Sequence, residues 1–388
     1  MQGRPIATEP PPPAQAADRL VSLDAFRGAT IVLMILVNNA GDWDKTYRPL
    51  LHAEWHGWTP TDLVFPFFLF AVGVAIPFAF AGRLTRSGGD RGPLHRQIVR
   101  RTILLFGLGL FLNWFPFYTV DWSIARIPGI LQRIAIVYCA AALAWLHLGK
   151  RSRVLLTIAL LAGYWLAMVL VPVPGYGAGD LSPKGNPEGW IDHLVFGHHT
   201  WKFSPGPGDP EGLLSTVPAI ASALAGLFAA DWLRSRRDQP EKLRGLLLWG
   251  CLATVAGLVL GLWFPINKSL WTSSYVVFTS GAALLLLAAA YVLVDMKRHE
   301  AWVRPFTVFG TNAIAAFFGS TLMAKTANLS RWQVSGGEMI SLQAWLYRHL
   351  FASWLPDYVA SLAWALMFVA VWWGVVAILS RRRIFLRV

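Results

Sequence analysis

The sequence is poor in charged residues and in cysteine. Only 14% of its 388 residues are charged, whereas soluble domains carry about a quarter. Hydrophobic residues make up 55% of the chain, in blocks long enough to cross a lipid bilayer. The two cysteines, Cys139 and Cys251, lie inside such blocks and can build neither a disulfide framework nor a metal site. This composition excludes an ordinary soluble protein and indicates a membrane protein.

Several common motifs are also missing. The sequence has no glycine-rich phosphate loop, no HExxH pair and no GxSxG turn, which argues against ATP-driven transport and against a serine hydrolase. The first residues lack the basic start and apolar core of a cleaved signal. We therefore expect residues 1–20 to be a disordered cytoplasmic tail, and residues 21–388 to be a single polytopic transmembrane domain.

Ten apolar blocks predict about ten transmembrane helices and an all-α fold, because backbone polar groups in lipid must be satisfied within each span. The blocks cover approximately residues 24–41, 60–82, 102–117, 127–148, 154–173, 213–233, 245–264, 273–295, 305–325 and 358–380.

The net charge of +13 is unevenly distributed. Basic residues gather in alternate connecting segments, as the positive-inside rule requires of cytoplasmic loops. This pattern predicts that both termini are cytoplasmic in a bacterial inner (plasma) membrane, and it explains the charge without a nucleic-acid partner. The basic segments are residues 83–101, 150–153, 234–244, 297–304 and 381–387.

Three connecting segments on the opposite side are long enough to hold a site: residues 42–59, 174–212 and 326–357. The middle one is rich in glycine and proline, which predicts irregular backbone. Residues 342–355 in the last have tryptophan and leucine at helical spacing but are too few to span. They predict a short interfacial helix.

The strongest local signal surrounds His52. Asn38 and Asn39 end the first predicted helix, and Asp62 begins the second, where a carboxylate can cap free amides. A tight helical hairpin would bring these groups close to His52. The simpler interpretation is a pair of helix caps and an exposed loop histidine. A metal site with His56 and Glu54 is a weaker alternative, because the loop does not resemble a helix.

Polar residues elsewhere are candidates for a second part of the site. Arg133, beside Gln132, lies within an apolar block, where an arginine normally faces a cavity or a partner. Arg133 could anchor a phosphate or carboxylate, or form a structural pair. Lys268, beside Asn267 in a polar turn, could bind an anion or lie at the interface.

Two further positions remain open at this stage. Asp209 and Glu211 precede the sixth predicted span and could either cap its first turn or bind a substrate. Asn312 is a polar break within the ninth span and could line the same cavity as Arg133.

Taken together, these stretches resemble the heparan-α-glucosaminide N-acetyltransferase family. The matching strings occur in the same order through nearly the whole chain, which makes the resemblance specific. They are residues 22–28 (SLDAFRG), 37–38 (VN), 52–57 (HAEWHG), 62–66 (DLVFP), 126–133, 209–213 (DPEGL), 267–268 with 270–271 (NK, LW) and 383–385 (RIF).

The resemblance implies transfer of an acetyl group from cytosolic acetyl-CoA to an amino sugar on the far side of the membrane. It implies that His52 is essential and that Asn38 supports it. The large luminal domain of the animal enzymes has no counterpart in these 388 residues, so we expect a bacterial acceptor in place of a long sulfated glycan. The expected partners are the lipid bilayer, acetyl-CoA, an amino-sugar or glycan acceptor and, in a homodimer, a second copy; no metal is expected.

The chemistry suits these residues. An amine must lose a proton before it attacks a thioester, and a histidine is well suited to accept that proton. Asn38 could stabilise the oxyanion. A route through acetylated His52 remains open. We group the candidates as catalytic (His52, Asn38, Asp62), cofactor-binding (Arg133, Gln132, Lys268, Asn267, Arg126) and substrate-binding (Asn39, Glu54, Trp55, Asp209, Glu211, Asn312).

Two other functions are compatible with the same sequence. An O-acyltransferase acting on a surface glycan or lipid headgroup would use the same base. A small-solute transporter would also suit ten helices, although it has no need of His52 in an outer loop.

Overall fold

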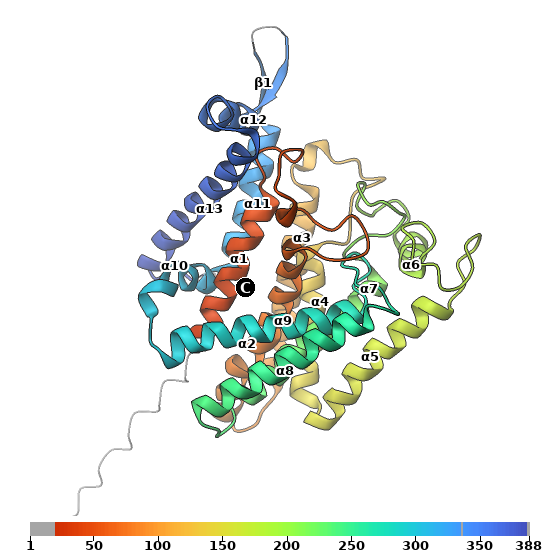
Figure 1. The fold of residues 1–388 in the computed structure, drawn as a ribbon, viewed down its shortest axis with the longest axis vertical. Coiled ribbons are helices and arrows are strands. Elements are labelled where there is room, and N and C mark those ends of the chain that lie inside the picture. Colours follow the sequence, from red (N-terminus) through yellow and green to blue (C-terminus); the bar gives the residue numbers. More distant parts are fainter. Residues whose placement is uncertain (1–19, 335–336, 386–388) are drawn as a thin grey trace, which may run out of the picture.

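The computed structural model describes residues 20–334 and 337–385, so nearly all of the predicted tail lies outside the described residues. The described chain is mainly helical (Figure 1). Its α-helices are α1 (Val21–Asn38), α2 (Val64–Arg86), α3 (Gly92–Trp114), α4 (Ile130–His147), α5 (Lys150–Leu170), α6 (Pro187–Phe196), α7 (Leu213–Leu233), α8 (Gln239–Leu260), α9 (Ser273–Tyr291), α10 (Glu300–Thr311), α11 (Ala313–Leu329), α12 (Leu342–Tyr347) and α13 (Asp357–Arg381).

Eight helices in the described residues are long and apolar enough to cross a membrane. Helices α10 and α11 together form a ninth candidate, bent by 73° at the predicted polar break, Asn312. Helix α3 overlaps the remaining predicted block, 102–117, but carries several arginines in its first half. The predicted all-α membrane architecture is therefore confirmed, while the count of ten spans stays a prediction.

The ends of the predicted spans are accurate where charge and apolar sequence change abruptly. Helix α7 has the predicted bounds, and α13 differs by a single residue at each end. Helix α3 begins ten residues before the predicted block, because Arg96, Arg100 and Arg101 continue the helix beyond its apolar part. A hydropathy profile detects only the part of a helix that is apolar enough to lie in the hydrocarbon core of the membrane.

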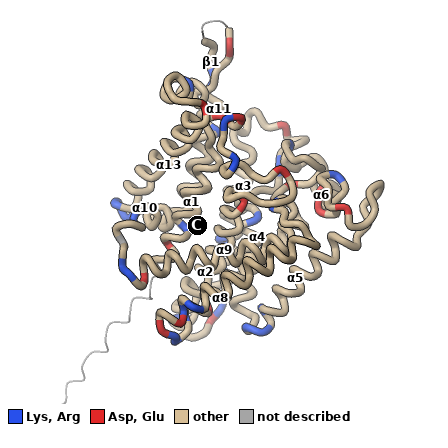
Figure 2. Tube along the Cα trace, in the orientation of Figure 1, with Lys and Arg blue, Asp and Glu red and all other residues tan. Residues whose placement is uncertain are grey.

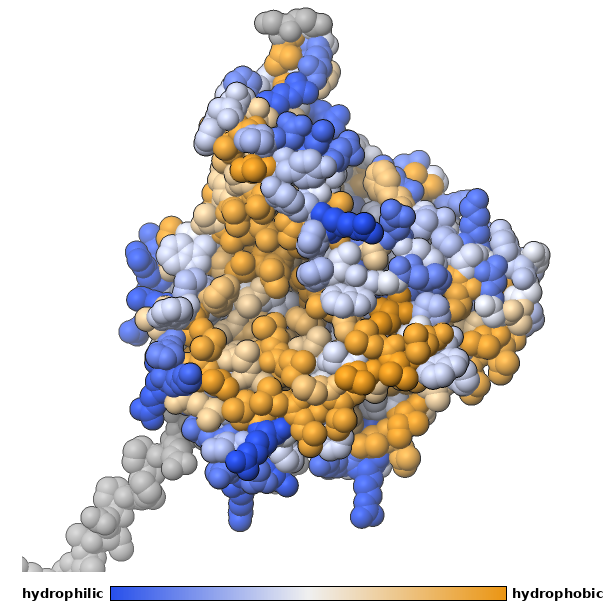
Figure 3. All heavy atoms as spheres, in the orientation of Figure 1, coloured by the Kyte–Doolittle hydropathy of each residue, from blue (hydrophilic) through white to orange (hydrophobic). Residues whose placement is uncertain are grey.

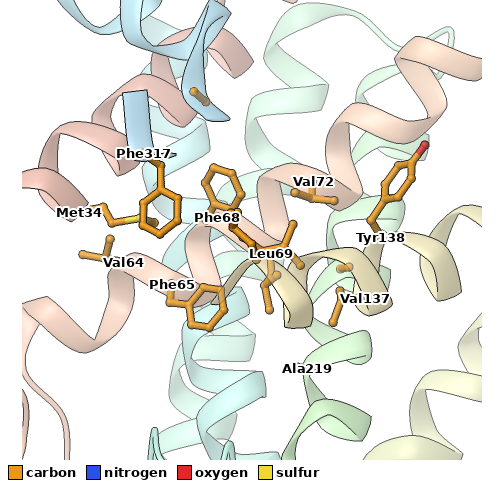
Figure 4. Close-up of a cluster of buried hydrophobic side chains, with 14 of the residues drawn as sticks. Met34, Val64, Phe65, Phe68, Leu69, Val72, Val137, Tyr138, Ala219 and Phe317 are labelled. Carbon is orange, nitrogen blue, oxygen red and sulfur yellow. The ribbon is translucent and has the colours of Figure 1, made fainter. Parts of the chain in front are cut away.

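Helix α2 lies at the centre of the bundle. Phe65, Phe68 and Leu69 on α2 pack between Met34 of α1 and Val137 of α4 (Figure 4). On another side α2 crosses α7 at very close range. A Cβ on Gly73 would lie 1.9 Å from the Ala223 carbonyl oxygen, and one on Gly226 would lie 2.1 Å from that of Phe70. Small residues at such a crossing allow the two helix backbones to touch.

The surface has the pattern expected of a membrane protein. In the view of Figure 3, apolar atoms form a broad belt between two hydrophilic margins. Lysine and arginine gather on the left and lower margins, near the ends of α10, α8 and α5 (Figure 2). The belt supports a multi-pass arrangement.

Two connecting segments are more regular than predicted. The glycine- and proline-rich middle segment contains α6, so the expectation of irregular backbone was partly wrong. Helix α6 begins with the Asn186 side chain accepting from the Gly189 amide, and Pro187 occupies its first turn. In the last segment, strands β1 (Arg331–Gln333) and β2 (Met339–Ser341) form an antiparallel hairpin that the all-α prediction missed.

The predicted interfacial helix at 342–355 is present but shorter. Helix α12 continues as a π-helical turn, η5 (Arg348–Ala352), so the helical stretch ends three residues early.

Candidate active site

The loop between α1 and α2 closes around the carboxylate of Asp62. Asp62 lies in a 3₁₀ turn, η2 (Pro60–Leu63), at the start of α2. One of its oxygens accepts hydrogen bonds from the amides of Ala53 (3.0 Å) and Thr59 (2.9 Å). The Thr59 hydroxyl donates to the Leu51 carbonyl at 2.6 Å, which ties the two ends of the loop together. Asp62 is therefore a cap, as predicted, and also organises the loop.

The other oxygen of Asp62 holds His52. It lies 2.6 Å from His52 Nδ1. An ionised carboxylate can only accept, so Nδ1 carries the proton and Nε2 keeps a lone pair. The carboxylate is buried, whereas about half of the His52 side chain is exposed. A buried acceptor thus orients an accessible imidazole with its basic nitrogen available.

A third group reaches this pair from the turn between α8 and α9. Lys268 Nζ lies 3.0 Å from His52 Nε2, 3.1 Å from Nδ1 and 3.9 Å from the Asp62 carboxylate. Burial lowers the pKa of Lys268, and the charges of Asp62 and Glu211 oppose that change. Lys268, predicted to bind an anion or to lie at the interface, thus contacts the predicted catalytic base, and its anion-binding role stays a prediction.

The turn that carries Lys268 is held by Asn267. The Asn267 side chain accepts from the Leu270 amide at 2.9 Å, and its amide group lies 3.3 Å from His56 Nδ1. A backbone bond from the Gly57 amide to the Ile266 carbonyl, at 2.8 Å, joins the same two segments. Burial lowers the pKa of His56. Asn267, predicted to bind a cofactor, therefore positions the turn against the His52 loop.

The other predicted residues of the first hairpin are placed differently. Asn38 is exposed at the end of α1, whereas Asn39 is buried and donates to the Ile35 carbonyl of its own helix at 2.7 Å. Trp55 donates to the Leu181 carbonyl at 2.8 Å and so anchors the loop to the segment before α6. Glu54 is exposed between them. Of these four residues, only Asn38 and Glu54 are exposed.

A second polar cluster joins the segment before α4 to that before α7. Arg126 donates to both oxygens of Asp209, at 2.8 and 2.6 Å, and to Glu211 at 2.6 Å. Burial disfavours the charge of Arg126, but these two carboxylates outweigh it and raise the Arg126 pKa. The first amide of α7, that of Leu213, donates to neither acid. Asp209 and Glu211 are therefore paired with an arginine and do not cap the helix.

Arg133 is fully buried beside this cluster. It donates to the Ser215 hydroxyl at 2.5 Å and the Gly212 carbonyl at 3.3 Å, and its guanidinium lies 4.9 Å from the Trp271 ring centroid. Arg133 Nε and Nη1 are buried without a hydrogen-bond partner among the described residues, so the structural and the anion-binding interpretations both stay open.

Sequence reasoning missed two carboxylates on α6. Glu188 accepts from the Ser215 hydroxyl at 2.9 Å, and Asp192 accepts from the amides of Asp209 and Leu213, at 2.9 and 2.8 Å. Burial and the charge of Asp192 raise the Glu188 pKa. The Asn-Pro-Glu start of α6 is a helix-initiation pattern, and it could have placed Glu188 and Asp192 on one face.

A cavity of about 1000 Å³ opens between the ends of α3 and α4, the segment after α6, and α11. It is large enough for a drug-sized ligand. Arg126 and Gln132, two of the predicted cofactor-binding residues, line it, together with Lys202 and Lys325; their cofactor-binding role stays a prediction. His52, Asp62 and Lys268 are outside this lining, as is Asn312, which is buried at the bend between α10 and α11.

Across residues 20–334 and 337–385, no three histidine, cysteine or acidic side chains gather as a metal site.

The chain matches two curated heparan-alpha-glucosaminide N-acetyltransferases. It is 32% identical to the protein of Mus musculus over 79% of its length, and 31% identical to that of Homo sapiens over 78%. The chain is a homologue of these acetyltransferases. It spans about half of their length, 54% and 52% respectively. Residues 19–182 also match a domain of unknown function, DUF5009.

The resemblance to these N-acetyltransferases that was inferred from the motifs is thereby confirmed. The matched DUF5009 region contains α1 to α5, and therefore the whole loop from His52 to Asp62.

Proposed function

We propose that the chain is a multi-pass acetyltransferase that moves the acetyl group of cytosolic acetyl-CoA to an amino sugar on the periplasmic side of a bacterial inner membrane. One observation carries the proposal: His52 Nδ1 is held 2.6 Å from buried Asp62, which leaves Nε2 as the basic nitrogen. The family relationship supports the reaction class. Both termini are cytoplasmic in this arrangement, and ten spans accommodate it.

The reaction begins with a proton transfer. The neutral acceptor amine attacks the thioester carbonyl while His52 Nε2 takes one of its protons, which leaves a neutral amide nitrogen. Asp62 keeps the imidazole in the required tautomer and stabilises the imidazolium that forms. The carbon–sulfur bond then breaks, and the imidazolium returns the proton to the CoA thiolate. Asn38, exposed at the end of α1, is the proposed donor to the oxyanion.

We assign the acceptor to the cavity, because its lining includes Lys202 and other residues of the segment 174–212, which is predicted to face away from the cytoplasm. Its polar lining side chains, among them Asn113 and Gln132, suit the hydroxyl groups of a sugar. Lys325→Met should therefore raise KM for the amino sugar while leaving KM for acetyl-CoA unchanged. The opposite pattern would assign the cavity to acetyl-CoA.

The test of the function is release of CoA from acetyl-CoA by purified protein, with glucosamine as acceptor. His52→Ala should abolish acceptor-dependent release, whereas His349→Ala, at another exposed histidine, should not. Acceptor-independent release would indicate hydrolysis or an acetyl-histidine intermediate. Release with a hydroxyl acceptor alone would favour O-acylation, and solute flux that survives His52→Ala would favour transport. The homodimer stays a prediction.

A further inference from the structure

Two arginines lie together where α2 ends and α3 begins. Arg83 is exposed in the last turn of α2, and its guanidinium donates to the Gln97 side chain on α3. Arg101 lies one helical turn beyond Gln97, on the same face of α3. Its guanidinium is 4.5 Å from the centre of the Tyr138 ring on α4. Within the described ranges no acidic side chain pairs with either arginine, so this basic cluster carries two uncompensated positive charges.

Two hydrogen-bond donors of the basic cluster are buried. Tyr138 is 1% exposed, and its hydroxyl makes no hydrogen bond of normal geometry in the part of the chain that the structure describes. The same holds for Arg101 Nε. Buried polar atoms are normally paired, and a phosphate group could accept from both of these donors as well as from the guanidinium groups. The donors of the cluster therefore suit an oxygen-rich anion.

The surface that continues from the basic cluster toward the middle of the bundle is apolar. Ala79 lies one turn before Arg83 on α2, Leu104 lies one turn after Arg101 on α3, and both are exposed. A basic pocket between helices on the side of the basic segments is typical of a site for the headgroup of an anionic lipid. A lipid would use both parts of this surface, whereas a soluble phosphate compound would leave the apolar part uncovered.

We propose that the basic cluster binds the phosphate headgroup of an anionic phospholipid, whose acyl chains lie against Ala79 and Leu104. Arg83 and Arg101 contact the phosphate oxygens from two different helices, and the Tyr138 hydroxyl donates to them from a third. The bound lipid joins the ends of α2, α3 and α4. This inference does not depend on the proposed acetyl transfer.

The experiment measures the binding of phosphatidylglycerol and of phosphatidylcholine with the same acyl chains to the delipidated full chain in detergent, by native mass spectrometry. Two arginines should favour the anionic lipid about 25-fold, because each contributes a factor of about five. Arg101→Gln and Arg83→Gln should each lower this preference about fivefold. Arg236→Gln, at an exposed arginine in another basic segment, is the matched control and should leave the preference unchanged.

An equal loss of preference in Arg236→Gln, or equal binding of the two lipids to the parent, would overturn the inference. Free coenzyme A separates the two sources of phosphate. Phosphatidylglycerol that stays bound at saturating coenzyme A supports the lipid site, whereas its displacement would assign the basic cluster to a soluble phosphate compound. If Arg101→Gln lowers the melting temperature, Arg83→Gln decides the test, because its side chain is exposed.

Discussion

Asp62→Asn tests the assigned role of the carboxylate with almost no change in shape. Two backbone amides point at one Asp62 oxygen, so an asparagine would direct its own oxygen there. Its NH₂ group would then face His52 Nδ1. That nitrogen could only accept, and the proton would move to Nε2, which removes the base. We expect kcat to fall about 10²- to 10⁴-fold, the range for loss of a general base or of its tautomer.

The same substitution also weakens a helix cap, so stability must be measured alongside activity. Loss of the carboxylate at the start of α2 should destabilise the protein by about 1 kcal/mol. Thr59→Ala is the matched control, because it removes the hydroxyl contacts to Leu51 and to the other Asp62 oxygen, and so weakens the same cap, but leaves the Asp62–His52 contact. Acceptor-dependent CoA release and thermal unfolding would be recorded for both. An Asp62→Asn enzyme within threefold of the parent kcat would refute the assignment.

Three further predictions concern Asn38, the Arg126 cluster and α6. Asn38→Ala should lower kcat about 10²-fold with little change in melting temperature, as expected for an exposed oxyanion donor; steady-state kinetics showing only a KM change would contradict this. Arg126→Gln should lower the free energy of unfolding by about 3 kcal/mol, because two carboxylates lose a buried partner. As a control, Lys45→Gln removes an exposed ion pair with Asp357, and its free energy of unfolding by chemical denaturation should match the parent. Because the Glu188 pKa is raised in the folded protein, its contribution to stability is complete below the ordinary glutamate range and is lost as the pH rises. The melting temperature of Glu188→Gln should therefore fall less than that of the parent between pH 5 and 8. Parallel plots of melting temperature against pH would contradict the raised pKa.

The sequence was most informative where local pattern determines structure. The apolar block at 213–233 became α7 with the same bounds, and Asp62 could be placed at a helix start from its neighbours. The proximity of His52 and Asp62 follows from a loop only ten residues long.

Contacts between distant segments could not be predicted in this way. Lys268 is 216 residues from His52, and nothing in its local turn indicates which loop lies opposite. Arg126 is 83 residues from Asp209, so their bidentate pairing depends on how α4 and α7 pack. The direction in which each polar side chain points could not be predicted from the sequence pattern either. Asn38 and Asn39 are adjacent, yet one faces solvent and the other its own helix.

The burial of Arg133 has a consequence for the order in which the chain is assembled. Its hydroxyl partner, Ser215, is 82 residues further along, so α4 reaches the membrane before that partner has been synthesised. Arg133 lies in the first turn of α4, and an unpaired arginine disfavours insertion by an amount that reaches about 2.5–3.5 kcal/mol at a helix centre. Helix α4 should therefore remain with the insertion machinery until α6 and α7 arrive. A chain truncated after α5 should be retained there or degraded.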